Sequence, residues 1–204
     1  MKLKEFKEIL YSLFMAEEET NQENVPKYII PACDATERAV ADFLKKYNFN
    51  RTFPLDVVLL ADKMGEYKIY YFSNSAEIQE KAEAAINTED KDILLNNRFK
   101  NSKEAYFVGR YIICKIIAHY ALNHIPRGSG WLEPKVKFRE EGDIVLNKET
   151  ANFAYELLLP KKDFLEQWKK LGEDVNKISL YFGASQRHVV ERKNFLLGNN
   201  SGGN

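Results

Sequence analysis

The chain has 204 residues, and its 30 Lys and Arg residues balance its 30 Asp and Glu residues. A chain of this length can bury a sizeable core within one domain. The zero net charge gives no overall field that would attract nucleic acid or an anionic membrane, although it does not exclude a local basic patch.

The sequence contains no membrane-spanning or export signal. Charged side chains and a histidine interrupt the most apolar stretch, residues 106–122, so that no run of 18 apolar residues occurs. The first six residues contain no apolar signal segment. Cys33 and Cys114 are too far apart to form a metal or redox motif, which fits a reducing compartment. We therefore predict a cytoplasmic protein that does not contact a membrane.

Residues 1–24 are predicted to form an amphipathic helix followed by a polar linker. Apolar residues recur there at helical spacing up to residue 14, and an acidic and polar stretch follows. Such a stripe usually packs in a core, and docking on a partner is the alternative. The stripe consists of Leu3, Phe6, Leu10, Leu13 and Phe14.

Local patterns predict further elements along the chain. A helix begins at the cap residue Asp34, and a second helix covers residues 55–64, where Gly65 ends it. Residues typical of β-structure predict strands at 67–72, 92–96, 135–139 and 144–146. Helical periodicity predicts a long helix at 102–123 and shorter helices at 148–158, 161–171, 175–182 and 185–196.

The long predicted helix contains a pattern that bears on function, because residues 110–124 read RYIICKIIAHYALNH. In a zinc-protease helix with the motif HExxH, two histidines four residues apart bind the ion, and the glutamate polarises a metal-bound water. If His119 is the second histidine, Lys115 occupies the position of the first and Ile116 that of the glutamate. The second half of the helix is apolar nearly all round, so we expect it to be buried, with Cys114 as a small core residue.

Four other segments resemble, in family order, the ImmA/IrrE family of zinc metallopeptidases. They are 54–65 (PLDVVLLADKMG), 93–96 (ILLN), 149–160 (ETANFAYELLLP) and 180–185 (LYFGAS), the last continuing to Arg192 and Leu196. The first is similar to the family helix P-x-D-V-x-x-L-A-x-x-x-G, and the third to its segment E-x-x-x-F-A-x-x-L-L-M-P. With the degenerate helix, the resemblance spans roughly residues 35–197.

This resemblance implies an α+β fold: a zincin-like domain that is rich in helices and has a small, mainly antiparallel sheet against the buried central helix. The implied domain covers residues 25–160, and the helices of residues 161–197 pack on it. Residues 198–204, rich in Asn and Gly, are expected to form a flexible tail. The resemblance also places Glu149 where the family has its third zinc ligand.

Two interpretations of Lys115 remain open. A buried ammonium is unfavourable unless it is paired, so Lys115 would pair with Glu149 and supply positive charge where the zinc ion would otherwise lie. Alternatively, its aliphatic stem lies on apolar neighbours while the ammonium reaches solvent.

Three residues remain as candidate metal ligands: His119, Glu149 and His124. On a continuous helix His124 would lie about 140° round from His119, a poor direction for a shared ion. Ile116 cannot accept a proton, so the general base is missing. We therefore predict no catalytic residue, no bound metal and no other cofactor, with zinc as the alternative. Otherwise the two histidines would form hydrogen bonds at a helix end, and Glu149 would be an acid at a helix start.

The resemblance implies regulation in phage or mobile genetic elements, where family members cleave a repressor of helix-turn-helix type. A member without catalysis would act by protein binding alone, as an antirepressor, a toxin–antitoxin component or an inhibitor of a host system. Its partner would be a helix-turn-helix repressor or a host defence protein. We therefore predict a pseudo-metallopeptidase.

Two alternatives follow from the same residues. The first is a divergent zinc endopeptidase that cleaves a repressor. The second is a DNA-binding regulator in which Arg187, Arg192 and Lys193 of the C-terminal helices contact phosphate. Acidic residues in the preceding helices dilute this charge, so direct binding of nucleic acid is not expected.

Overall fold

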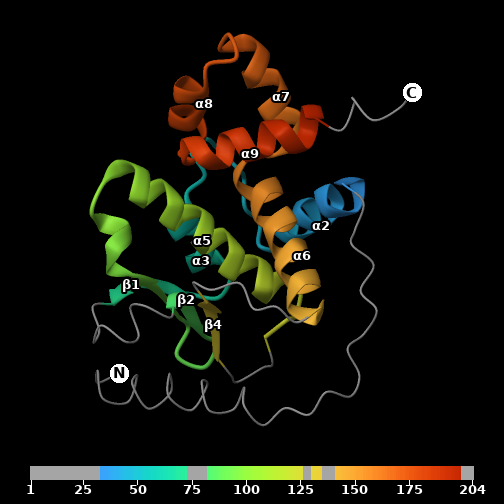
Figure 1. The fold of residues 1–204 in the computed structure, drawn as a ribbon. Helices are drawn as coiled ribbons and strands as arrows, with labels where there is room; N and C mark the ends of the chain where they lie inside the picture. Colours follow the sequence, from blue (N-terminus) through green and yellow to red (C-terminus); the bar gives the residue numbers. More distant parts are fainter. Residues whose placement is uncertain (1–32, 73–81, 126–129, 135–140, 199–204) are drawn as a thin grey trace.

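The computed structural model describes residues 33–72, 82–125, 130–134 and 141–198 (Figure 1). The predicted helix and linker of residues 1–24, the predicted strand at 135–139 and the tail beyond Gly198 lie outside the described residues. The described part combines helices with a small sheet, so the predicted α+β class is confirmed.

Four strands form one mixed sheet in the order β1-β3-β2-β4. They are β1 (Lys68–Phe72), β2 (Ala82–Asn87), β3 (Asp92–Asn96) and β4 (Gly130–Pro134). β1 runs parallel to β3, whereas β2 is antiparallel to both β3 and β4. The predicted strands at 67–72 and 92–96 are thus confirmed as β1 and β3.

Seven α-helices and one 3-10 helix are described. They are α2 (Cys33–Lys46), α3 (Val57–Lys63), η1 (Asn97–Lys100), α5 (Lys103–Ala121), α6 (Glu141–Leu158), α7 (Lys161–Lys170), α8 (Val175–Phe182) and α9 (Gln186–Leu197). Figure 1 shows the sheet on one side of α5, and α7 to α9 gathered at the C-terminal end of α6. None of the described helices is long and apolar enough to cross a bilayer.

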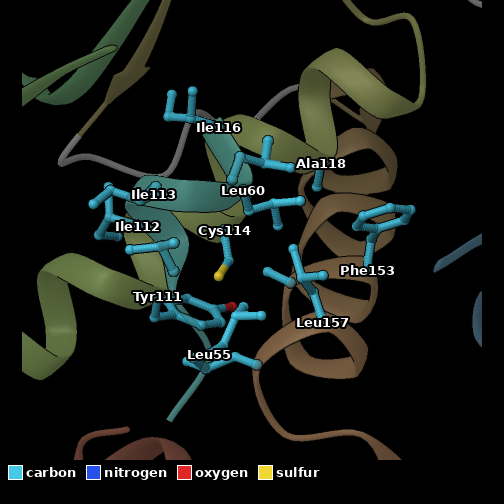
Figure 2. Close-up of a cluster of buried hydrophobic side chains, with 14 of the residues drawn as sticks. Leu55, Leu60, Tyr111, Ile112, Ile113, Cys114, Ile116, Ala118, Phe153 and Leu157 are labelled. Carbon is cyan, nitrogen blue, oxygen red and sulfur yellow. The ribbon is translucent and has the colours of Figure 1, made fainter. Parts of the chain in front are cut away.

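The core forms where α5 packs against α6 and α3. Ten residues between Gly109 and His119 of α5 are buried, as its apolar sequence predicts. Figure 2 shows side chains from these helices converging around Cys114, which is fully buried and whose pKa is raised by burial to about 12. Phe153 and Leu157 of α6 supply the opposite wall. Each large aliphatic side chain buried here contributes about 1.5–3 kcal/mol.

Two sequence predictions about the sheet were wrong or incomplete. Residues 144–146 are not a strand, because α6 begins at Glu141 and runs through them. The strand β2 was not predicted, since its sequence AEAAIN is rich in a helix-forming residue and shows no alternation. Pairing with β3 on one side and β4 on the other overrides that local preference.

The turn between α8 and α9 is fixed by short-range and long-range contacts. Gly183 ends α8 with φ 63°, a left-handed conformation suited to glycine, and Ser185 Oγ accepts from the N–H of His188 to cap α9. The buried side chain of Arg110 donates to the Gly183 carbonyl at 2.8 Å and to the Leu55 carbonyl at 2.5 Å. Arg110 therefore ties the C-terminal helices to α5 and to the segment before α3.

Candidate functional site

The helix α5 positions the three residues that stand in the zinc-protease pattern. Ser102 caps it by accepting from the N–H of Ala105, so the helix begins one residue after the predicted start. Ile116 is fully buried and belongs to the apolar cluster of Figure 2. His119 is 2% exposed, and Lys115 is half-buried. The position that a general base requires is thus part of the hydrophobic core.

The described contacts place Lys115 beside Asn147 rather than Glu149. Lys115 Nζ lies 3.4 Å from Oδ1 of Asn147, a residue of α6. Glu149 instead contacts His124, with 3.5 Å between Glu149 Oε2 and His124 Nε2. The predicted Lys115–Glu149 pair is therefore absent from the described contacts.

The end of α5 brings His124 back towards His119. The helix stops at Ala121, and Asn123 has φ 58°, which reverses the chain direction. The N–H of His124 then donates to the His119 carbonyl at 2.9 Å, and the two Nδ1 atoms lie 3.3 Å apart. The prediction that His124 lies 140° round a continuous helix was wrong, because the helix ends before it.

Glu149 lies in the interior of α6, not at a helix start as predicted. The side chains of His124 and Glu149 are 6% and 11% exposed. His119, His124 and Glu149 thus form a buried chain in which each residue contacts the next.

Burial controls the charge of this chain of residues. Burial, together with the neighbouring His119, lowers the pKa of His124 to about 4. The carboxylate of Glu149 favours the opposite shift, but it is itself desolvated, and burial raises its pKa. We therefore take His124 as neutral at pH 7. The tautomer with hydrogen on His124 Nε2 leaves His124 Nδ1 to accept from His119 Nδ1, and its Nε2 lies 3.5 Å from Glu149 Oε2.

These residues do not fit a catalytic zinc ion. Such an ion requires three converging protein ligands and an open position for water. The Nδ1 atoms of His119 and His124 face each other. Glu149 contacts His124 in the described contacts and is not seen to contact His119. Within the described parts of the chain, no group of three or more His, Cys, Asp or Glu side chains is arranged to hold a metal ion.

A cavity of about 580 Å³ opens beside this site. Its lining comes from α2, from Tyr67 before β1, from Thr88 after β2 and from the segment that follows His119. Sequence analysis did not single out these residues. No sequence motif connects these residues, because they come from four separate segments of the chain.

The candidate phosphate contacts on α9 are already engaged. Arg192 is 3% exposed and donates from Nη2 to Glu156 at 2.5 Å and from Nε to the Leu159 carbonyl at 2.9 Å. Arg192 is therefore engaged within the fold rather than presented for the phosphate contact of the DNA-binding alternative. Arg187 is exposed but pairs with Glu191 at 2.8 Å. Lys193, the third candidate, has its Nζ 5.9 Å from the Trp168 ring centroid.

The buried histidine of α9 has a consequence for acid stability. His188 Nδ1 lies 2.9 Å from Ser185 Oγ, and its ring centroid lies 4.0 Å from that of Tyr111. Burial lowers the pKa of His188; Glu191 opposes this shift and Arg187 adds to it, and the pKa lies at about 4. The pKa in the unfolded chain is about 6.5. Between these values the unfolded chain binds the additional proton, so this residue destabilises the fold as pH falls from about 6.5 to about 4.

We expect His188→Gln to reduce the loss of stability across this pH window. The check is the free energy of unfolding, measured with denaturant at pH 7, 6, 5 and 4 for wild type and variant. The pKa of His124 is also lowered to about 4, so part of the dependence of the unfolding free energy on pH will remain in both proteins. Parallel slopes for the two proteins would show that His188 is not the responsible group.

Comparisons with known proteins give little beyond this geometry. No protein-family model matches the chain, and no curated protein matches it. A solved structure described as a Mycobacterium tuberculosis transcriptional regulator is 17% identical and superimposes with a TM-score of 0.46. The match covers 78% of this chain and 55% of that chain, so this chain spans about half the length of the regulator. At this level of similarity the match assigns no function.

Proposed function

We propose that this chain is a catalytically inactive relative of the ImmA/IrrE metallopeptidases that regulates by binding a protein partner. Its proposed setting is phage or mobile-element regulation, where it acts as an antirepressor, a toxin–antitoxin component or an inhibitor of a host system. The partner is a helix-turn-helix repressor or a host defence protein.

The observation that carries the loss of catalysis is the environment of Ile116. Its side chain is fully buried in the core, at the position where proton transfer would require a carboxylate. A water molecule could be activated at this position only if the protein core around Ile116 opened. Lys115, beside it, bears an ammonium that repels a metal cation. Both departures support a site that cannot hydrolyse a peptide bond.

The binding part of the proposal rests on the family resemblance of the sequence. A relative that has lost hydrolysis but retained affinity would sequester its partner rather than destroy it. The contacts of Arg192 with Glu156 and of Arg187 with Glu191 support a packing role for α9 over a DNA contact.

The experiment is capture of the partner from the native host with the tagged full chain, followed by incubation of the purified complex. We expect a stoichiometric partner whose intact mass is unchanged after incubation with added zinc. Partner fragments that appear with zinc and disappear with a chelator would instead support the endopeptidase alternative. Duplex DNA binding that weakens steeply with salt would support the DNA-binding alternative.

A further inference from the structure

Two pairs of aromatic rings line the cavity beside α5. Phe43 of α2 and Tyr47, which directly follows α2, meet edge to face, with ring centroids 5.0 Å apart. Tyr67 and Tyr120 form a second edge-to-face pair, with centroids 5.6 Å apart. All four rings line one cavity of about 580 Å³, a volume within the range of small-ligand sites. The cavity is therefore suited to an aromatic group packed between rings.

The polar groups that line this cavity include the ammonium of Lys46, an exposed residue, and the hydroxyl of Tyr67. Lys46 Nζ lies 5.0 Å from the Tyr47 ring centroid, so the protein itself supplies the cation that this ring attracts. Burial, with Tyr120 and Tyr47 nearby, raises the pKa of Tyr67 to about 12. The Tyr67 hydroxyl is thus a hydrogen-bond donor at neutral pH. Lys46 and Tyr67 line the same cavity and are complementary to an anionic oxygen.

We propose that this cavity binds a small aromatic carboxylate. The ring of the ligand packs between the Phe43–Tyr47 and Tyr67–Tyr120 pairs, and its carboxylate contacts the Lys46 ammonium and the Tyr67 hydroxyl. This ligand site goes beyond the proposed function and does not depend on the identity of the protein partner.

The cavity adjoins the buried histidines. Asn123 and Ile125 line it, and they flank His124 on both sides. Tyr120 also lines it and directly follows His119. A ligand in the cavity therefore contacts the same turn that holds the two imidazoles together, and binding would stabilise this turn.

Asp42 supplies the opposing charge. It lies on α2 four residues before Lys46 and also lines the cavity, so its carboxylate repels an anionic ligand and attracts an ammonium. Removing this charge should strengthen binding of a carboxylate. The sign of that effect separates an anion site from a cation site.

The test is calorimetric titration of the full chain with three probes of the same shape: 3-phenylpropanoate, its primary amide and 3-phenylpropylamine. We expect the carboxylate to bind roughly tenfold more tightly than the amide, because it gains one charge-assisted contact, and we expect the amine to bind most weakly. Lys46→Gln should reduce the carboxylate to the affinity of the amide, and Tyr67→Phe should weaken it. Asp42→Asn should strengthen it.

Lys45→Gln is the matched control. It removes the same charge from the same helix, at an exposed residue that is not among those lining the cavity. It should leave all three affinities unchanged. The proposal is wrong if none of the probes binds, if the amine binds best, or if Lys45→Gln and Lys46→Gln have equal effects.

Discussion

The double variant Lys115→His/Ile116→Glu is expected to be much less stable than wild type without zinc and to regain stability when zinc is added. The new glutamate replaces a fully buried isoleucine, so an uncompensated charge enters the core at a cost of about 3–5 kcal/mol. For a chain of this size that corresponds to a melting temperature lower by roughly 10 °C. Scanning calorimetry of the metal-free proteins measures it.

Zinc should recover part of this loss, because the variant rebuilds the pattern HExxH ending at His119. Binding to the folded state alone contributes about 2.7 kcal/mol when zinc exceeds its dissociation constant a hundredfold. Glu149 must leave His124 to become the third ligand, which is a local side-chain movement. The single variant Lys115→His is the control, since it adds a ligand without burying a charge. A double variant whose melting temperature does not respond to zinc would contradict the interpretation of a disabled metal site.

The second large effect concerns the ion pair that joins α6 to α9. Arg192→Met should destabilise the fold by about 3–5 kcal/mol, because it leaves the carboxylate of Glu156 buried without its guanidinium. Urea unfolding at pH 7 measures the change. Adding Glu156→Gln to this variant should restore part of the stability, since the unpaired charge is then removed.

Arg187→Met is the matched control on the same helix. The side chain of Arg187 is 79% exposed, and its pair with Glu191 is open to water, so we expect a loss below about 1 kcal/mol. If Arg192→Met proves as mild as Arg187→Met, the Glu156–Arg192 pair does not hold the C-terminal helices in place.

Local sequence signals were sufficient where an element ends at a strong cap. Asp174 and Gly183 bound α8 at the predicted residues, and Ser185 begins α9 as predicted. The strand β2 shows the opposite case, because only its pairing with two neighbours makes an alanine-rich segment extended. The placement of Lys115, Ile116 and His119 on one helix followed from their spacing, which needs no tertiary information.

The partners of these residues could not be predicted in the same way. Asn123 turns the chain through a positive φ without the glycine that usually signals such a turn, so the contact between His124 and His119 was not foreseen. The position of Glu149 depended on where α6 begins, which is seven residues before the predicted start at residue 148. The tyrosine-lined cavity combines four segments, and its chemistry exists only in the folded chain.

The most direct test of the central claim is the zinc content of the full chain, purified without chelator and measured by elemental analysis. In the proposed relationship Lys115 and Ile116 replace a ligand and the base, and Glu149 contacts His124. We therefore predict far less than one zinc per chain and no change in melting temperature with chelator. One tightly held zinc per chain, whose removal lowers the melting temperature, would contradict the account.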